Sequence, residues 1–377
     1  MIHKAHILGF SENWIWQVRN SASCPLIHCA RRTTVVEPRQ KRFQILALSG
    51  GGFRGLYTAK ILADLEEEIG APIATRFDLI AGTSIGGILA LAIAAGIPAK
   101  TMVNLFVEHG EEIFKRRFSL KGMLRAPYSA EPLQNLLSDP SLFGQRTLGN
   151  CKHPVLIPAI NYSSGQPQVF KTPHHLSFKR DHQFRLVDIA LATSAAPAYF
   201  PRHTFNNNQY VDGGLYANAP GLLAAHEAQI FFQQPSEAVH LLSIGTMSSK
   251  FTANPGRNRD GGTYDWGGIN PANTPKRLFG LSISVLESLS DFMLRHRLPG
   301  RYIHIDETLT DERASAVALD KADGPAKEVL LGAASEQSKF WLGKDELQPY
   351  LGHLASPPRF FYGLNATEGS SENVETE

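Results

Sequence analysis

Short apolar runs alternate with stretches of helical periodicity over much of this chain. The run at 45–48 is typical of a buried strand, and apolar residues then recur at helical spacing over 57–65, which predicts an amphipathic helix. The same order returns at 78–81 and 88–93, as a short buried strand and a buried helix. This alternation, from residue 43 to about residue 245, predicts an α/β fold with a largely parallel central sheet flanked by helices.

The pattern changes outside that region and divides the chain. Residues 1–43 lack clean periodicity and carry seven Lys/Arg against two Asp/Glu, so we expect a disordered or non-native basic segment. Residues 44–250 form the predicted core. Residues 251–365, a loop followed by a helix over 277–296, complete the same domain and are a candidate regulatory region. Residues 366–377 are acidic and polar, and we expect a disordered tail.

Composition argues against several classes of protein. The formal net charge of +2 argues against a surface for a nucleic-acid polymer. No apolar run reaches the length of about 18 residues that predicts a transmembrane helix, and the N-terminus makes a poor signal peptide. The cysteines Cys24, Cys29 and Cys151 form neither a disulfide framework nor a metal pattern. We therefore expect a cytoplasmic protein whose site holds no metal.

The loop after the first strand is rich in glycine. Residues 50–55 read GGGFRG and match G-x-G-x-x-G at Gly50, Gly52 and Gly55, between a strand and a helix as a dinucleotide-binding fingerprint requires. A Walker A loop is excluded, because no Gly-Lys-Ser/Thr follows. A third interpretation uses the glycine N–H groups as an oxyanion hole, with Arg54 ordering the loop through its carbonyl groups or attracting an anionic head group. The loop alone does not decide between these interpretations.

The second strand runs into a G-x-S-x-G sequence. Residues 82–86, GTSIG, place Ser84 between Gly82 and Gly86 in the strand–turn–helix context of a nucleophile elbow. Such a turn exposes the serine hydroxyl at a helix N-terminus, where the helix dipole favours developing negative charge. A simple glycine-rich turn is the alternative. The segment counts against a dinucleotide site, since the second strand of such a site should end in an acidic residue, and Asp78 precedes the strand instead.

A nucleophilic serine needs a base to accept its proton. The chain has 14 histidines, but His226 falls in a predicted helix and His304 in a predicted strand. The better candidate is Asp212 in NQYVDGGLYANAP, at the end of a strand and followed by Gly213 and Gly214. A carboxylate base there requires desolvation to raise its pKa toward the working range. The alternative is an Asp-Gly hairpin turn.

Together, GGGFRG, GTSIG and DGG resemble the motifs of the patatin-like phospholipases, and LVDIALATSAAPAYFPRH and LYANAP resemble the segments around the third motif. The resemblance covers about 44–246. It implies a patatin-like three-layer fold and a serine acyl hydrolase of phospholipase A type that needs no cofactor. Its Ser–Asp dyad has Ser84 as nucleophile and Asp212 as base. The implied oxyanion-hole residues are Gly50, Gly51, Gly52 and Arg54. The other motif glycines are Gly55, Gly82, Gly86, Gly213 and Gly214.

The length, the single catalytic unit and the short helical C-terminal part also resemble a bacterial subgroup of this family. Its members are anti-phage phospholipase effectors activated by cyclic dinucleotides such as cyclic GMP-AMP. The resemblance therefore implies an activating cyclic dinucleotide as a ligand. The Gly/Asn/Arg-rich loop at 254–274 and the region after it are candidate sensors, and an ordinary insertion is the alternative.

A phospholipid membrane surface is the partner that this chemistry implies. Residues 113–128 mix apolar side chains with five Lys/Arg, a composition that suits an anionic lipid surface, although a solvated helix end has the same composition. The basic N-terminal segment, with Trp14 and Trp16, is a second candidate membrane arm. We expect peripheral binding at the inner face of the membrane. The oligomeric state stays open, with a homo-oligomer as one alternative.

A different class of function stays open as well. In it, the chain is a nucleotide-binding regulatory module or an inactive scaffold, and the glycine-rich loop binds phosphate. A fluorophosphonate probe separates the two classes, because it labels only an activated serine.

Overall fold

The computed structural model describes residues 42–117, 125–247, 274–308 and 316–367. The predictions for the basic N-terminal segment, the loop at 254–274 and the acidic tail fall almost wholly outside these ranges. Within them, no helix has the length and apolar character needed to cross a membrane.

A mixed sheet of eight strands forms the centre of the described fold. Its order is β5-β6-β3-β2-β1-β7-β8, with β4 paired to β3. The five neighbours β3, β2, β1, β7 and β8 are parallel, which confirms the predicted parallel sheet there, whereas β4, β5 and β6 pair antiparallel beside them. The strand bounds are β1 Phe43–Leu48, β2 Leu79–Gly82, β3 Val155–Asn161, β4 Gln166–Lys171, β5 His203–Phe205, β6 Asn208–Asp212, β7 Val239–Ile244 and β8 Tyr302–Ile305.

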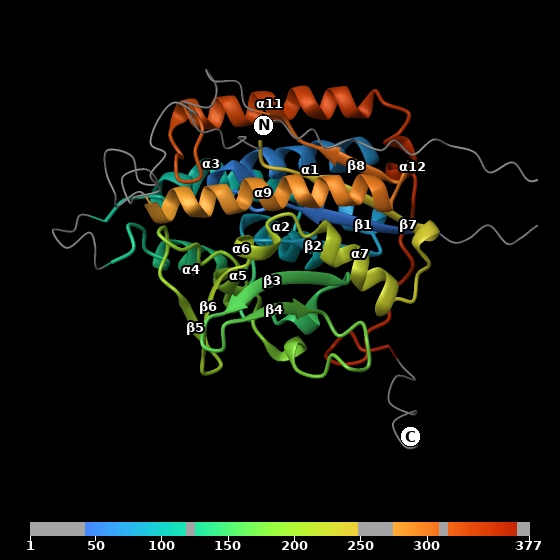
Figure 1. Cartoon of the computed structure of the whole chain (residues 1–377), viewed down its shortest axis with the longest axis horizontal. Coiled ribbons are helices and arrows are strands. Elements are labelled where there is room, and N and C mark those ends of the chain that lie inside the picture. The colour runs from blue at the N-terminus through green and yellow to red at the C-terminus, as the bar shows by residue number, and fades with distance from the viewer. Residues whose placement is uncertain (1–41, 118–124, 248–273, 309–315, 368–377) are drawn as a thin grey trace, which may run out of the picture. The chain divides into compact units, whose positions relative to one another are not determined.

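Helices cover both faces of this sheet and make three layers (Figure 1). The helices α1, α2, α3, α5 and α11 pack on one face, and α7 and α9 pack on the other. The predicted helix at 277–296 is confirmed as α9. The bounds are α1 Gly55–Ile69, α2 Ile85–Ala94, α3 Ala99–Ile113, α4 Glu131–Leu137, α5 Leu186–Thr193, α6 Gly214–Ala217, α7 Gly221–Ile230, α9 Thr274–Arg297, α11 Gly324–Leu342 and α12 Gln348–Leu351.

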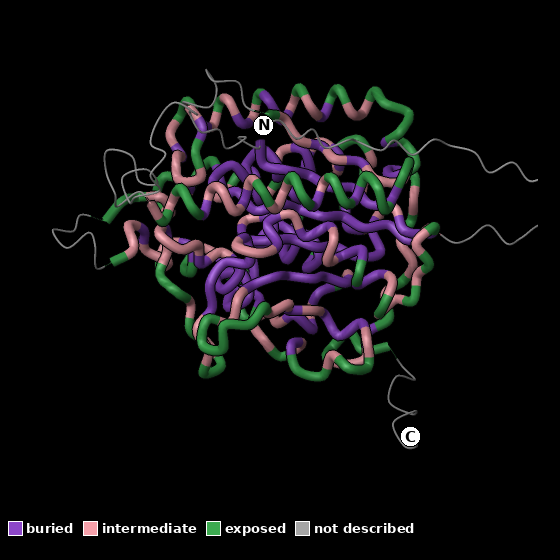
Figure 2. Tube along the Cα trace, viewed as in Figure 1, coloured by how far each residue is buried: buried purple, intermediate pink, exposed green. Residues whose placement is uncertain are grey.

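The first strand shows why the sequence reads as a continuous apolar run. Leu46 and Leu48 pack toward the α1 side of the sheet, whereas Phe43, Ile45 and Ala47 pack toward α7. Because both faces are covered, every residue of β1 is buried, and strict alternation with polar residues is lost (Figure 2). β1 begins at Phe43, two residues before the predicted run and inside the segment that we expected to lie outside the fold.

β3 brings the ends of two distant strands together. Its residues Val155 and Leu156 pair with β2, whereas 159–161 pair with the antiparallel strand β6. Since β4 occupies the other side of β3, β2 and β6 follow one another along the same side and run toward each other. The turn after Gly82 and the last residue of β6, Asp212, therefore meet at this junction.

Candidate active site

Ser84 lies in a sharp turn between β2 and α2. Its φ of 55° and ψ of −125° are strained for a residue with a side chain. A Cβ on Gly82 would lie 2.1 Å from the carbonyl oxygen of Gly86, and a Cβ on Gly86 would lie 2.3 Å from that of Leu48, so both positions require glycine. The Ser84 N–H donates to Thr193 Oγ1 at 3.0 Å. The turn thus has the backbone of a nucleophile elbow.

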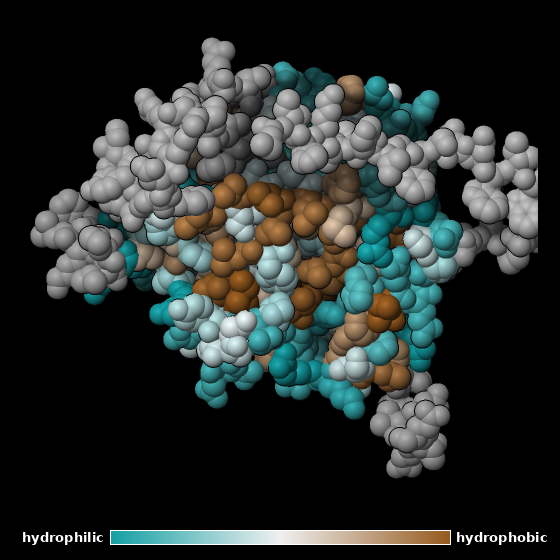
Figure 3. Space-filling view, viewed as in Figure 1, coloured by the Kyte–Doolittle hydropathy of each residue, from teal (hydrophilic) through white to brown (hydrophobic). Residues whose placement is uncertain are grey.

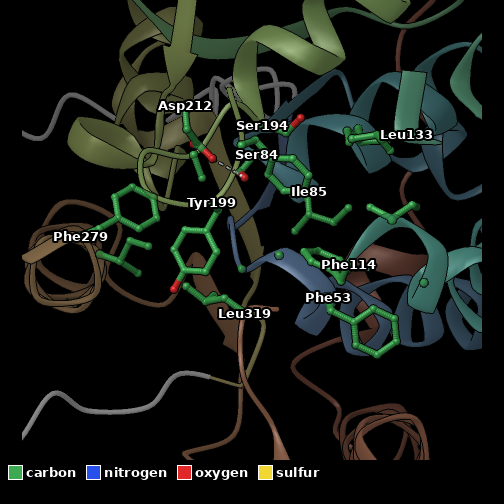
Figure 4. Close-up of a pocket in the computed structure, with 18 of the residues that line it drawn as sticks. Phe53, Ser84, Ile85, Phe114, Leu133, Ser194, Tyr199, Asp212, Phe279 and Leu319 are labelled. Atoms are coloured by element: carbon green, nitrogen blue, oxygen red, sulfur yellow. Dashed lines mark hydrogen bonds between the residues drawn. The ribbon is translucent and has the colours of Figure 1, made fainter. Parts of the chain in front are cut away.

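The serine hydroxyl contacts the predicted base. Ser84 Oγ donates to Asp212 Oδ2 at 2.6 Å (Figure 4), and Asp212 Oδ1 accepts from the Gly214 N–H at 2.7 Å. Asp212 is 1% exposed, and this burial raises its pKa to about 7, although both hydrogen bonds oppose the shift. A carboxylate that titrates near neutral pH and touches a serine hydroxyl has the geometry and the acidity of a general base.

The two glycines after Asp212 turn β6 directly into α6. A Cβ on Gly213 would lie 2.4 Å from the carbonyl oxygen of Pro158, and a Cβ on Gly214 would lie 2.9 Å from Asn218 Oδ1. The Asp-Gly-Gly sequence therefore joins a strand to a helix, and its interpretation as a hairpin turn is wrong.

Two alternatives from the sequence lose their support. Among the described residues, no histidine hydrogen-bonds to Ser84 or Asp212; His226 lies in α7 and His304 in β8, as predicted. Asp78 precedes β2, where its carboxylate accepts from the Gln44 N–H at 2.8 Å. It is therefore at the opposite end of the strand from a ribose-binding carboxylate.

The glycine-rich loop presents two backbone donors beside Ser84. The Gly50 N–H donates to the carbonyl oxygen of Asn218 at 3.0 Å, so this hydrogen is already used and does not point to an oxyanion. The N–H groups of Gly51 and Gly52 donate to no group within the described residues, and both glycines line the same pocket as Ser84. Of the three predicted donors, these two are the ones placed to receive an oxyanion.

Hydrogen bonds fix the carbonyl groups of Gly50 and Gly51 in this loop. Gly50 O accepts from Asn218 Nδ2 at 3.2 Å and from Thr246 Oγ1 at 3.1 Å. Gly51 O accepts from the Arg54 N–H at 3.2 Å and from Arg54 Nε at 3.4 Å. In a planar trans peptide, the carbonyl and the next N–H point in opposite directions. Fixing these two carbonyls therefore fixes the directions of the Gly51 and Gly52 N–H groups.

Close packing explains why three side chains are missing from this loop. A Cβ would lie 2.4 Å from Asn218 Oδ1 at Gly50 and 2.2 Å from Thr246 Oγ1 at Gly51. Gly52 has a φ of +57°, and its Cβ would lie 2.2 Å from the carbonyl oxygen of Leu319. Arg54 is buried, and its Nη1 donates to Met247 O at 2.9 Å, which supports the predicted role in ordering the loop.

An apolar pocket of about 70 Å³ extends from the serine. Its walls come from the glycine loop, α2, α3, α4, the segment after α5 and α9 (Figure 4). Ligand pockets typically enclose about 300–1,000 Å³, so these walls must separate before a long acyl chain enters. The principal wall residues are Phe53, Phe114, Leu133, Tyr199, Phe279 and Leu319.

Among the described residues, no group of three or more His, Cys, Asp or Glu is arranged to hold a metal ion.

Known proteins place this site in a family. The family model described as "Patatin-like phospholipase" matches residues 46–225. The chain is 43% identical over 329 residues to the "cGAMP-activated phospholipase" of Pseudomonas aeruginosa, an alignment that covers 86% of this chain and 96% of that protein. The chain belongs to the patatin-like phospholipase family. It is therefore a hydrolase of lipid esters, and the predicted family, enzyme class and fold class are confirmed.

Other members of the patatin-like phospholipase family show the same relationship. Proteins named "cGAMP-activated phospholipase" from Escherichia coli and Vibrio cholerae are each 35% identical to this chain, over 74% and 76% of its length and 84% and 87% of their own. Among solved structures, VipD from Legionella pneumophila aligns with 79% of this chain and 67% of its own, at 11% identity and a TM-score of 0.36. The family assignment rests on the sequence relatives.

Three residues that hold the glycine-rich loop of this patatin-like phospholipase carried no predicted role. Asn218 lies in the quoted segment LYANAP but carried no predicted role, and Thr246 directly follows Gly245 after β7. Glu287 of α9 accepts from Asn218 Nδ2 at 2.7 Å. Only the position of Asn218, six residues after the base, offered a local signal.

Proposed function

We propose that this chain cleaves the acyl esters of membrane phospholipids through an acyl-serine intermediate on Ser84, with Asp212 as the base. The hydrogen bond of 2.6 Å between Ser84 Oγ and the buried Asp212 carboxylate carries this proposal. Family membership supplies the lipid ester, and the apolar pocket beside the serine suits an acyl chain.

The proposed reaction follows from the positions of the donors and the base. Ser84 Oγ attacks the acyl carbon while Asp212 takes its proton, and the carbonyl oxygen becomes an oxyanion held by the Gly51 and Gly52 N–H groups. The C–O bond to the alcohol breaks, and the leaving lysophospholipid takes the proton from Asp212. Water then attacks the acyl-serine, gives a proton to Asp212, and releases the fatty acid; Ser84 regains that proton.

The proposed base predicts a pH dependence. We expect kcat/KM for a soluble short-chain ester to rise with pH and to reach half its plateau near pH 7, because only ionised Asp212 accepts the serine proton and burial raises its pKa to about 7. The measurement is a rate profile across the neutral range. A half-plateau near pH 4, where a solvated aspartate titrates, would contradict the buried base.

The names of the relatives and the narrowness of the pocket both support an activating ligand. Relatives that match most of this chain are named for activation by cGAMP, and we propose cyclic GMP-AMP or a similar cyclic dinucleotide as the activator. Such a ligand would act by opening the narrow pocket, since its walls must separate before a long acyl chain enters. The candidate sensor loop at 254–274 lies almost wholly outside the described residues.

α9 supplies a surface for the membrane. Its side chains Phe279 and Ile283 line the pocket, and other apolar residues of α9 are exposed on the surface (Figure 3). An apolar helix face of this kind buries in the boundary between headgroups and acyl chains. We propose that α9 helps a peripheral enzyme dock on phospholipid; of the other candidate at 113–128, residues 118–124 lie outside the described ranges. The exposed apolar residues of α9 are Leu278, Val285, Leu289, Phe292 and Met293.

A labelling experiment tests the proposed function against the nucleotide-module alternative. We expect a fluorophosphonate to label wild-type protein at Ser84, with more labelling when cyclic GMP-AMP is added, and to leave Ser84→Ala unlabelled. Release of fatty acid from phospholipid vesicles is measured in parallel. The glycine loop faces a narrow apolar pocket, which leaves little room for phosphate and disfavours the alternative. Absence of labelling in wild type with and without the nucleotide would support the alternative.

A further inference from the structure

A second hollow lies next to the active-site pocket. It is an open groove of about 790 Å³ lined by Arg117, by Arg125 and Ala126, by the end of β3, and by the loop that leads into β5. Its volume falls in the range of about 300–1,000 Å³ that is usual for small-molecule sites. The dyad does not reach it, so the proposed reaction leaves this groove without a role.

The charged residues that line the groove are all basic. Arg117, Arg125 and Arg202 lie on its walls, and none of its 13 lining residues is acidic. Within the described residues, none of the three arginines forms an ion pair with a carboxylate. Three arginines in one groove with no acidic lining residue stand out in a chain whose formal net charge is +2. Such a concave basic surface attracts an anion.

An aromatic ring lies among these charges. Tyr162 is 54% exposed and also lines the groove, and the Arg202 guanidinium lies 4.6 Å from the centre of its ring. Guanidinium groups match the oxygens of a phosphate, and an exposed aromatic ring or a guanidinium plane stacks on a base. Ile160 and Val211 add apolar surface to the lining of the groove. This combination suits a nucleotide better than it suits a small inorganic anion.

The groove shares a wall with the active-site pocket. Phe200 lines both hollows, and its neighbour Tyr199 lines the pocket. Ala198, in the same wall, has a φ of 67°, which is unusual for a residue with a side chain. The Tyr128 N–H donates to Tyr199 O at 3.2 Å, which ties this wall to the segment that carries Arg125. A ligand that draws the arginines together therefore acts on the wall that keeps the pocket narrow.

We propose that this groove binds an anion with phosphodiester groups, and that its physiological occupant is the activating cyclic dinucleotide. This inference rests on the proposed function and specifies where its activator binds. The arginines hold the phosphodiesters, Tyr162 stacks on a base, and Phe200 carries the effect to the pocket. A phospholipid headgroup carries the same phosphodiester chemistry, and the experiment separates the two sources.

The test compares charge-neutralised variants of the full chain. One variant combines Arg125→Gln with Arg202→Gln, and its matched control combines Arg180→Gln with Arg297→Gln, which remove the same charge outside the groove. We expect the Kd for cyclic GMP-AMP, measured by equilibrium dialysis, to rise about tenfold or more in the groove variant, because each arginine offers charge-assisted hydrogen bonds. The control should bind like wild type. Hydrolysis of a soluble ester without nucleotide should be unchanged in both.

Tyr162 supplies a second and independent measurement. Tyr162→Ala should weaken binding of cyclic GMP-AMP by about tenfold through lost stacking, and Tyr162→Phe should restore it. A merely structural role of Tyr162 would lower the melting temperature instead and leave the Kd unchanged.

Each contrary outcome has its own signature. Wild-type affinity for cyclic GMP-AMP in the groove variant would overturn the proposal; if its KM for anionic phosphatidylglycerol vesicles also rose, the groove would be a lipid-headgroup site instead. Wild-type protein that binds no cyclic GMP-AMP would overturn both the proposal and the proposed activator. Failure of fluorophosphonate to label Ser84 would overturn the proposed chemistry alone, because dialysis measures binding without turnover.

Discussion

Ser84→Ala and Asp212→Asn will each reduce phospholipid hydrolysis by about 10⁴-fold or more, because nucleophile and base act as one unit and removing either one removes the covalent pathway. The expectation rests on the hydrogen bond of 2.6 Å between the two side chains and on the burial of Asp212. The measurement is fatty-acid release from vesicles with cyclic GMP-AMP present. Near-normal turnover in Asp212→Asn would show that another group accepts the serine proton.

Thermal stability provides the control for these variants and has a predicted sign. Burial raises the pKa of Asp212 from an ordinary value of 3.8 to about 7, so ionising it is less favourable in the folded chain than in the unfolded chain. The wild type therefore loses stability as pH rises from about 4 to 7. Asp212→Asn, which stays neutral, should melt at a higher temperature than wild type at pH 8, and the difference should shrink as pH falls through 7.

Asn218→Asp will lower kcat by about tenfold to hundredfold and leave KM for a soluble ester nearly unchanged, since a misplaced catalytic donor weakens transition-state stabilisation. The aspartate has the size of the asparagine but lacks Nδ2, which donates to Gly50 O at 3.2 Å. The carboxylate also faces Glu287, whose Oε1 lies 2.7 Å from Nδ2. The Gly50 carbonyl is then no longer held from this side, and the Gly51 N–H loses its fixed direction.

Thr246 and Glu287 offer matched controls for Asn218. Thr246→Val removes the second donor to Gly50 O, at 3.1 Å, and should lower kcat less than Asn218→Asp does, whereas Thr246→Ser should restore it. Glu287→Gln keeps an oxygen acceptor for Asn218 and should remain close to wild type. Melting temperatures separate these effects from misfolding. Unchanged kcat in both Asn218→Asp and Thr246→Val would show that the Gly51 N–H does not depend on this support.

Much of the fold was predictable because its parallel strands are buried on both faces. The apolar runs at 45–48 and 78–81 became β1 and β2, and the helical patterns after them became α1 and α2. Among the antiparallel strands, β6 was predicted as the strand that ends at Asp212, whereas β4 and β5 were not, because they are only partly buried and their residues do not form an apolar run.

The candidate site was predictable where it depends on local backbone. Gly82 and Gly86 frame Ser84 because one tight turn brings them together, and Gly52 has a positive φ that favours glycine. Such requirements act over a few neighbouring residues and therefore leave a short motif in the sequence. The three motifs, in order, indicated the family, and they contain Ser84 and Asp212, which the structure places in hydrogen-bond contact.

Tertiary structure alone decided how the site is held and what surrounds it. Ser84 and Asp212 are 128 residues apart, and they meet because β2 and β6 run toward each other along β3. The raised pKa of Asp212 comes from burial beneath many segments, and the support of the glycine loop by Asn218 and Glu287 joins residues from α9 and the turn before α7. The basic groove likewise gathers arginines from separate segments. Contacts of this kind depend on distance in space and not on spacing along the chain, so no local pattern in the sequence reports them.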